Sequence, residues 1–317
     1  MNKLRILVAN EPAPLGGVEA WRVFWPLTLL ERTYGDYLQI TYSRGNIFPH
    51  EFFQHDILFC CRPCDESHTR TLRAAKSHGL KIIIDFDDNF LNVPYGHADF
   101  KYLAFAKKPV LECLALADAV WVTTPALKEV YGAHSKNCVI IPNAILPEEL
   151  PDEPTGFNGF AMWRGAHAHV EDLWTWRSQY EQILKRIKQF LFIGYMPSWA
   201  EKKTEATVNF LLWVETQEWF QSLRSMRPCA IWKPLMPAAI NDAKSCIAFL
   251  EATIAGGLCV TNYAGKPGWE LAWKELPKKD SDFENGWRNA AEHVREHYDL
   301  RAWNEVRYRE LLKLVNG

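Results

Sequence analysis

The feature that most constrains the fold is an alternation of short apolar runs with longer segments of helical period. The runs in the first half lack the polar alternation of half-exposed strands, as expected of parallel strands covered by helices on both faces. They lie at 4–9, 37–42, 56–61, 81–86, 119–124 and 138–143. The alternation predicts an α/β fold with a parallel sheet, and it argues against an all-helical or all-β domain.

A polar, proline-rich stretch at 147–159 separates this series from a second one. The second series has apolar runs at 159–165, 189–195, 208–215, 229–235 and 258–263. The length of 317 residues suits two domains of ordinary size. We therefore predict two Rossmann-like domains, residues 1–150 and 151–317, and we allow the last helix to pack back on the first domain.

Composition and charge exclude several classes of protein. The chain has 48% hydrophobic residues, which rules out disordered and fibrous classes. Its 36 Lys and Arg against 38 Asp and Glu give a net charge of -2, so no whole-molecule basic field attracts nucleic acid, although a local basic rim is not excluded. The first apolar run is too short for a secretory signal and no run reaches 18 residues, so we expect a cytoplasmic protein without a membrane span. Eight scattered cysteines fit reduced, buried thiols.

Two glycines lie between the first predicted strand and the first predicted helix. Gly16 and Gly17 would let the backbone approach a ligand closely, and the helix that follows would offer unpaired amides to a phosphate. A plain connecting loop is the alternative. Neither a GxGxxG motif nor a P-loop lysine accompanies these glycines, so the familiar dinucleotide and P-loop sites are not predicted.

An acidic motif, DFDDN at 85–89, ends a buried strand at the edge where open α/β sheets bind their ligands. Asp87 and Asp88 are candidate catalytic residues that would contact an acceptor or serve as a general base, and His97 follows eight residues after Asn89. The alternative is a strand-end turn in which Asp and Asn bond their own backbone.

Basic residues take corresponding places in the second half. Arg164 and Gly165 leave a strand and enter a helix, where they suit a phosphate. Lys244 and Ser245 are predicted to open a helix that suits a diphosphate. Glu251 would follow about two turns later on the same face, at a distance that suits the hydroxyls of a ribose. The alternative is a capped amphipathic helix with a surface lysine and glutamate.

Three further motifs lack the partners that a metal or redox site requires. They are the histidines at 167 and 169, the cysteines at 61 and 64, and the HVREH motif at 293–297. We predict no metal site from them, and the two cysteines are more typical of thiols at a strand end.

Taken together, the motifs resemble GT-B glycosyltransferases, particularly the large retaining group numbered family four. The resemblance is carried by the GGVE turn at 16–19, VTTPALKEVYG at 122–132, VIIPNAI at 139–145 and the run from Lys244 to AGGLCV. It implies two Rossmann-like domains facing a central cleft, with a nucleotide-sugar bound mainly by the second domain and the acceptor by the first.

The resemblance also implies roles for individual residues. Glu251 matches the family's ribose-binding glutamate. The donor phosphates would be met by Gly16, Gly17, Arg164, Lys244 and Ser245. The family has a second glutamate where this chain has Ala243, so retaining stereochemistry is not implied.

The expected activity is transfer of a hexose or pentose from a nucleoside diphosphate sugar, a UDP-sugar above all, to a hydroxyl group. No metal or other cofactor would be required, because basic side chains and helix ends neutralise the leaving group. The chain is also short for the family, and its DFDDN strand end and the AKS sequence at 243–245 resemble those of compact GT-B enzymes of bacteriophages, some of which glycosylate hydroxymethylated pyrimidines. Duplex DNA with such a base, flipped into the cleft, is therefore the expected acceptor. A glycan or small-molecule acceptor and a non-catalytic nucleotide-sugar-binding module are the alternatives.

Overall fold

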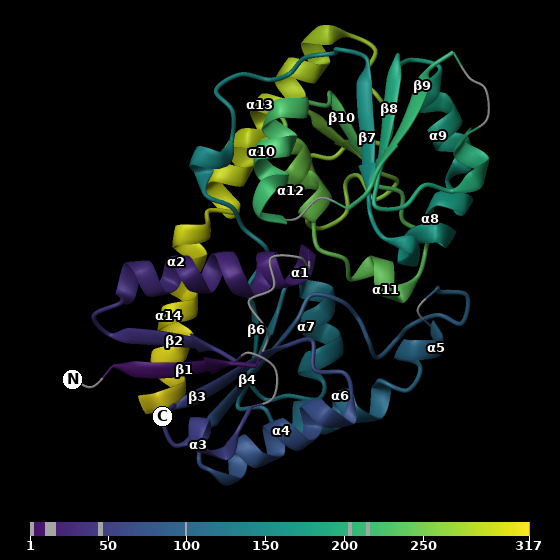
Figure 1. Ribbon diagram of the computed structural model, residues 1–317. Helices are drawn as coiled ribbons and strands as arrows, with labels where there is room; N and C mark the ends of the chain where they lie inside the picture. Colours follow the sequence, from purple (N-terminus) through teal and green to yellow (C-terminus); the bar gives the residue numbers. More distant parts are fainter. Residues whose placement is uncertain are drawn as a thin grey trace.

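The computed structural model describes residues 3–9, 17–43, 47–98, 100–201, 205–213 and 216–316. In this part of the chain, the strands form two parallel sheets with helices packed around each (Figure 1). The first sheet has the order β2-β1-β3-β4-β5-β6, and the second has the order β11-β10-β7-β8-β9. The strands are β1 (Leu4–Val8), β2 (Leu38–Tyr42), β3 (Ile57–Cys61), β4 (Lys81–Phe86), β5 (Ala119–Val122), β6 (Cys138–Ile140), β7 (Phe160–Arg164), β8 (Gln189–Ile193), β9 (Thr207–Leu211), β10 (Ala230–Trp232) and β11 (Leu258–Val260).

Helices connect consecutive strands, as parallel pairing requires. Those of the first half are α1 (Gly17–Glu19), the π-helical turn η1 (Ala20–Phe24), α2 (Trp25–Tyr34), α3 (Pro49–Phe52), α4 (Glu66–Ser77), α5 (Phe100–Leu103), α6 (Lys107–Leu116) and α7 (Pro125–Gly132). The remainder are the short 3-10 helices η2 (Pro147–Glu149), η3 (His167–His169) and η4 (Ser198–Glu201), and the α-helices α8 (Val170–Thr175), α9 (Arg177–Leu184), α10 (Thr216–Met226), α11 (Ala239–Asp242), α12 (Ile247–Ile254), α13 (Asp280–His297) and α14 (Leu300–Asn316). Among the described residues, no helix is long and apolar enough to cross a membrane.

Both sheets are buried on two faces, which explains the uninterrupted apolar runs. Every residue of β3 is buried, and so are the last four residues of β8. Burial on both faces favours apolar side chains at every position of a parallel strand, rather than at every second one. The parallel α/β architecture predicted from these runs is confirmed.

The sequence of 171–189 has the residue pattern of one long helix, but the segment contains two helices, α8 and α9. Trp176 lies between α8 and α9 with φ -106° and ψ 23°, outside the helical range. Its indole nitrogen donates a hydrogen bond of 3.0 Å to the carbonyl of Leu235. This tertiary contact accompanies the break in a sequence that would otherwise continue as a helix.

The last two helices, α13 and α14, pack on different halves of the protein. α13 packs on the second sheet, where Trp287 is buried and donates to the carbonyl of Thr253 at 2.9 Å. α14 then runs back to the first sheet and packs against α2, as the yellow ribbon in Figure 1 shows. There Tyr308 stacks on Tyr34 with ring centroids 4.0 Å apart, and Asn304 donates to the carbonyl of Pro26 at 2.9 Å.

Asp85, the first carboxylate of DFDDN, stabilises the fold and does not face the cleft. Arg22, from the π-helical turn, donates to the two oxygens of Asp85 at 2.8 and 2.6 Å and to the carbonyl of Ile141 at 2.8 Å. Both charged side chains are at most 1% exposed. A buried charge is tolerated in a protein interior only when it is paired and hydrogen-bonded in this way.

Removing this arginine should destabilise the protein strongly. We expect Arg22→Met to lower the free energy of unfolding by about 3–5 kcal/mol, because Asp85 would remain buried without its cation. Arg5 makes the same two-nitrogen pair with Asp56 at the surface, so Arg5→Met should cost at most about 1 kcal/mol. Urea unfolding of both variants at pH 7 measures the difference, and equal losses would contradict the assignment.

Candidate functional site

A cavity of about 700 Å³ lies between the two sheets, at the carboxyl ends of β3, β4, β7 and β10. Nine of the residues predicted from the sequence line it: Gly17, Asp87, Asp88, His97, Arg164, Gly165, Lys244, Ser245 and Glu251. Gly16 lies outside the described residues. The topology therefore brings the described candidates from both halves of the chain to one place.

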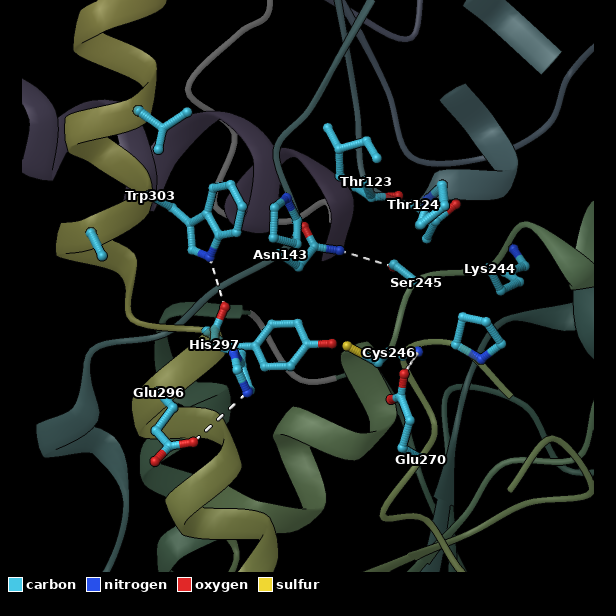
Figure 2. Close-up of a pocket in the computed structure, with 18 of the residues that line it drawn as sticks. Thr123, Thr124, Asn143, Lys244, Ser245, Cys246, Glu270, Glu296, His297 and Trp303 are labelled. Atoms are coloured by element: carbon cyan, nitrogen blue, oxygen red, sulfur yellow. Dashed lines mark hydrogen bonds and ion pairs between the residues drawn. The ribbon is translucent and has the colours of Figure 1, made fainter. Parts of the chain in front are cut away.

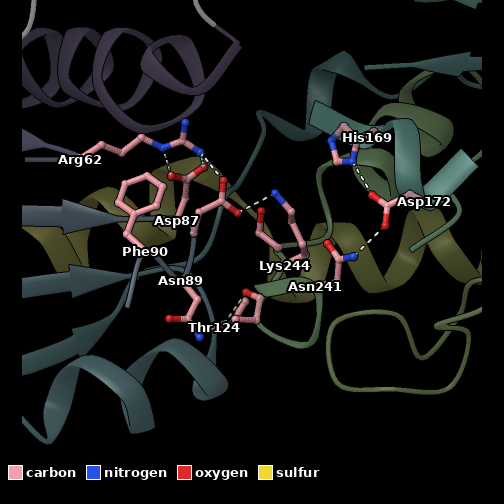
Figure 3. Close-up of polar contacts among 12 residues, drawn as sticks. Arg62, Asp87, Asn89, Phe90, Thr124, His169, Asp172, Asn241 and Lys244 are labelled. Atoms are coloured by element: carbon pink, nitrogen blue, oxygen red, sulfur yellow. Dashed lines mark hydrogen bonds and ion pairs between the residues drawn. The ribbon is translucent and has the colours of Figure 1, made fainter. Parts of the chain in front are cut away.

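The two candidate carboxylates are held by an arginine that the sequence analysis missed. Arg62 follows β3, and its Nη2 donates to Asp87 at 2.8 Å and to Asp88 at 2.6 Å, while its Nε pairs with the other oxygen of Asp87 (Figure 3). The backbone of Arg62 has a φ of 54°, a left-handed conformation that is uncommon outside glycine. Its place after the strand next to β4, at the same sheet edge, is a signal that could have identified it.

The two neighbouring carboxylates have different electrostatic surroundings. Burial raises the pKa of Asp87, and the charge of Asp88 adds to this, against the opposing effect of Arg62. Burial would raise the pKa of Asp88 as well, but Lys244 and Arg62 outweigh it and the pKa falls. Asp88 is thus the carboxylate that stays ionised most readily, and Asp87 is the one that takes up a proton first.

Lys244 and Ser245 do not open a helix, contrary to the sequence prediction. α12 begins at Ile247 after Cys246, whose φ of -83° and ψ of 30° lie outside the helix. The segment before it is hydrogen-bonded to the first half, where Thr124 donates to the carbonyl of Ala243 at 3.1 Å. Lys244 is therefore not on the helix face of Glu251, because tertiary contacts hold its segment away from the helix.

This segment also carries polar contacts that cross the cleft. The Nζ of Lys244 lies 2.7 Å from Oδ1 of Asp88, which Figure 3 shows as a link between the two halves. Asn143, after β6, donates to Oγ of Ser245 at 2.9 Å (Figure 2). A lysine expected to meet phosphate thus contacts a candidate catalytic carboxylate instead.

A second cavity, of about 550 Å³, lies beyond the same segment and is shown in Figure 2. Lys244 and Ser245 border both cavities. The second cavity is bounded by the turn between α13 and α14, with Trp303 on its wall, and neither of the paired carboxylates lines it. The cavity between the sheets is therefore the better candidate for chemistry.

Glu251 is buried and takes part in a hydrogen-bonded cluster with two aromatic rings. Its Oε1 accepts hydrogen bonds from Arg164 at 2.9 Å and from the indole of Trp219 at 2.7 Å. The guanidinium of Arg164 lies 4.1 Å from the ring centre of Trp213 and 4.5 Å from that of Trp219. The glutamate and the arginine were predicted from the sequence, but their pairing was not.

Arg164 keeps hydrogen-bonding capacity at the cavity wall. Its side chain is 7% exposed, and Nε and Nη2 have no partner within the described part of the chain. Burial lowers the pKa of this guanidinium, although Glu251 acts in the opposite direction. Two unpaired donors on a buried cation favour an anionic ligand, because an unpaired buried donor is costly.

A second group of residues that the sequence analysis missed surrounds His169. Its Nδ1 lies 2.7 Å from Asp172, and its Nε2 lies 3.1 Å from the Nζ of Lys233, which follows β10. Burial and the charges of Lys233 and Lys244 lower the pKa of His169 to about 4, although Asp172 raises it. The neutral imidazole therefore donates to Asp172 and accepts from Lys233. From the sequence, this histidine was a candidate only for a metal ligand.

Lys233 is a buried cation at the cavity wall. Burial and the charge of Lys244 lower its pKa to about 8, while Asp172 and Glu251 raise it. Together with Arg164 and Lys244 it makes the second-half wall basic. The first-half wall is acidic, with Glu19, Asp87 and Asp88 against Arg62.

Gly165 is explained by packing. A Cβ there would lie 2.6 Å from the ring of Trp163 and 3.1 Å from the ring of His169. The first distance is too short for a real Cβ contact and the second is tighter than usual, so a larger residue would require Trp163 to shift. This requirement is independent of any ligand, although Gly165 does line the cavity.

In the described ranges, Cys64, Asp65 and His68 form a group whose ligand atoms lie within 4.8 Å of one another. The group surrounds the start of α4, where Asp65 caps the helix by accepting from the backbone of His68 at 2.9 Å. A helix N-terminus disfavours a cation, so helix capping accounts for this arrangement.

Comparison with known proteins identifies the fold of the chain. No family model and no curated protein matches the chain. Solved structures do match it at low identity. HepE from Anabaena, in complex with UDP, has a TM-score of 0.65 at 12% identity over 98% of this chain and 100% of that chain. A glycosyltransferase from Rickettsia africae has a TM-score of 0.61 at 11% identity, covering 100% of both chains.

The catalytic domain of starch synthase IV from Arabidopsis thaliana, bound to ADP and acarbose, has a TM-score of 0.55 at 12% identity, covering 100% of both chains. These likenesses and the two parallel sheets identify the architecture as the GT-B fold. The fold class expected from the sequence is confirmed.

Proposed function

We propose that the protein is a glycosyltransferase that uses a nucleoside diphosphate sugar. The observation that carries this proposal is the opposite charge of the two walls of one cavity. Arg164, Lys233 and Lys244 face it from the second half, and Asp87 and Asp88 face it from the first. A basic wall suits a diphosphate leaving group, and an acidic wall suits an acceptor hydroxyl that must lose a proton.

The donor would bind along the second-half wall. The unpaired nitrogens of Arg164 and the ammonium groups of Lys233 and Lys244 would contact the diphosphate. Glu251, oriented by Arg164 and Trp219, would accept hydroxyl hydrogen bonds from the ribose. UDP is the favoured nucleotide because HepE, similar to this chain in fold, was solved with UDP.

The transfer forms a bond between the acceptor oxygen and the anomeric carbon and breaks the bond from that carbon to the diphosphate. The acceptor proton would pass to Asp88, which stays ionised most readily, with Asp87 and Arg62 positioning it. The cationic wall would stabilise the charge that the departing diphosphate gains. If the anomeric configuration is retained, the leaving phosphate itself would accept the proton.

A hydroxymethylated pyrimidine in DNA remains the acceptor that we propose, and a glycan or a small molecule is the alternative. The acidic wall supports only a hydroxyl acceptor in general. Incubation with donor and DNA that contains hydroxymethylcytosine, followed by digestion and mass measurement of the nucleosides, tests the choice. No mass increase with any common donor would leave the other two acceptors.

A non-catalytic nucleotide-sugar-binding module is the second candidate function. It is favoured by Ala243, which takes the place of a glutamate in the resembling family, and by the ion pairs that both carboxylates already make. A panel of nucleoside diphosphate sugars, scored for binding by calorimetry and for released nucleoside diphosphate, separates the two. Tight binding without release, with acceptors supplied, would favour the module and contradict the enzyme.

Donor binding should depend on pH through Lys233. Its pKa of about 8 means that it is charged below pH 8 and neutral above, so the affinity for UDP should fall as the pH rises from 7 to 9. One linked proton gives at most a tenfold fall per pH unit. The terminal phosphate is already ionised in this range, since its second pKa is about 6.

The control for this prediction is Lys233→Arg, which keeps its charge throughout the range. Calorimetric titration of UDP at pH 7, 8 and 9 should show a sloping affinity for the wild-type protein and a flatter one for this variant. Parallel profiles would remove Lys233 from the donor site.

A further inference from the structure

A third hollow lies on the outer side of the first half, between α4 and the segment from α5 to α6. It measures about 1340 Å³, and Cys64 borders both this groove and the cavity between the sheets. Figure 1 shows α4 and α6 side by side, away from the second half. The groove therefore adjoins the cavity between the sheets at Cys64.

The groove is locally basic in a chain of net charge -2. Of the described residues that line it, five are cationic and three are acidic. The cations are Arg70, Arg73, Lys101, Lys107 and Lys108. Asp65, one of the three acids, already caps α4. Glu112 pairs with Arg73 at 3.4 Å and with Lys108 at 4.0 Å, so one acid is shared by two cations.

Two of these lysines lie at a helix end that disfavours positive charge. Lys107 and Lys108 are the first residues of the ten-residue helix α6, whose first turn contains no acid. A helix N-terminus is positive, so lysines there are electrostatically unfavourable for folding. The positive field of the helix N-terminus and the charges of the two lysines both attract an anion.

An aromatic ring stands among the cations. Phe105 lies in the same lining and is 82% exposed, which leaves its face free for a planar partner. Among the described side chains, the lining contains no Asn, Gln, Ser, Trp or Tyr, and its one hydroxyl, on Thr69, donates to the carbonyl of Asp65. A neutral glycan would gain nothing from the excess of cations, whereas a phosphate backbone would. A flat membrane would fit a hollow between two helices poorly.

We propose that this groove binds a strand of nucleic acid as the acceptor, with its phosphates on the basic residues and a base stacked on Phe105. The strand would lead the nucleotide that carries the hydroxyl group past Cys64 into the cleft. The inference rests on the proposed function for the chemistry of transfer, but binding in the groove can be measured without it. Cations that follow a backbone and an aromatic ring that stacks on bases are the usual means of holding a single strand.

The test is fluorescence anisotropy of a labelled single-stranded 12-nucleotide oligonucleotide with the full chain. The double variant Lys107→Ala/Lys108→Ala should weaken binding about tenfold at low salt. It should also reduce the slope of log affinity against log salt by about 1.4, since each phosphate contact contributes about 0.7 on a single strand. Phe105→Ala should weaken binding at least about fivefold. The matched control is Lys278→Ala/Lys279→Ala, an exposed lysine pair on the other half, which should change neither value.

Several results would overturn the proposal. They are an equal effect of the control pair, no oligonucleotide binding at 50 mM salt, or binding of heparin that matches the oligonucleotide and ignores Phe105→Ala. Binding of anionic phosphatidylglycerol vesicles that depends on the same residues, without oligonucleotide binding, would also overturn it. Calorimetry of UDP with each variant should be unchanged. Failure of UDP to bind the wild-type protein would contradict the proposed function and leave the oligonucleotide result to be judged on its own.

Discussion

Lys244→Ala should lower the rate of sugar transfer by about 100- to 1000-fold while the protein stays folded. A cation or donor that stabilises charge developing in the transition state typically contributes that much. The fold should survive because the lysine belongs to no helix and Asp88 keeps its second cation, Arg62. Turnover is measured as nucleoside diphosphate released from the donor that the panel identifies, and folding by thermal unfolding.

Lys266→Ala is the matched control for this variant. Lys266 lies in the same half and also makes one ion pair, with Asp242 at 3.1 Å, but both partners are about half exposed. Its loss should leave turnover within about twofold, because exposed pairs contribute little. Lys244→Arg, which keeps the charge, should recover part of the rate. Unchanged turnover in Lys244→Ala would remove this lysine from the proposed diphosphate site.

The strands were predictable from the sequence because burial on both faces of a parallel sheet forces apolar residues at successive positions. The same reasoning placed Asp87, Asp88 and Arg164 at strand ends, and strand ends of one sheet meet at one edge. Residues that follow strands are therefore brought together by topology alone. That rule, applied to every strand, would also have selected Arg62 after β3 and Lys233 after β10.

Pairing between distant residues was not predictable in this way. Nothing local to Asp85 indicates that it meets Arg22, which lies 63 residues earlier in the chain. The local sequence around Lys244 is compatible with the start of a helix, so it predicts one. Hydrogen bonds from Thr124 and Asn143, both in the first half, accompany the different conformation that the structure shows.

The contact between Lys244 and Asp88 predicts that removing the charge of Asp88 strengthens UDP binding. An ion pair with a purely structural role would not have this effect. Before the donor binds, the ammonium group of Lys244 is paired with Asp88, although the diphosphate would need the same group. Asp88→Asn keeps the shape of the side chain and removes its charge, so the ion pair with Lys244 is reduced to a hydrogen bond with a neutral amide. We expect UDP to bind about three- to tenfold more tightly to this variant, which corresponds to about 1 kcal/mol for a partly buried ion pair.

The same substitution should abolish most of the transfer. A general base typically contributes a factor of about 100 to 10,000, and asparagine cannot accept the acceptor proton. Tighter donor binding together with slower transfer would indicate that Asp88 competes for Lys244. A simple loss of structure would weaken donor binding instead. Calorimetry with UDP measures the first effect, and released nucleoside diphosphate measures the second.

Two variants make this test specific to the Lys244 contact. Asp87→Asn removes a carboxylate that pairs with Arg62 and not with Lys244, so its effect on UDP affinity should be smaller. In Lys244→Ala/Asp88→Asn, the affinity should equal that of Lys244→Ala alone, because a competitor has no effect once its target is absent. Weaker UDP binding to Asp88→Asn would show that Asp88 supports the donor. In the proposed order of events, the diphosphate takes Lys244 first, and Asp88 becomes free to accept a proton only when the donor is in place.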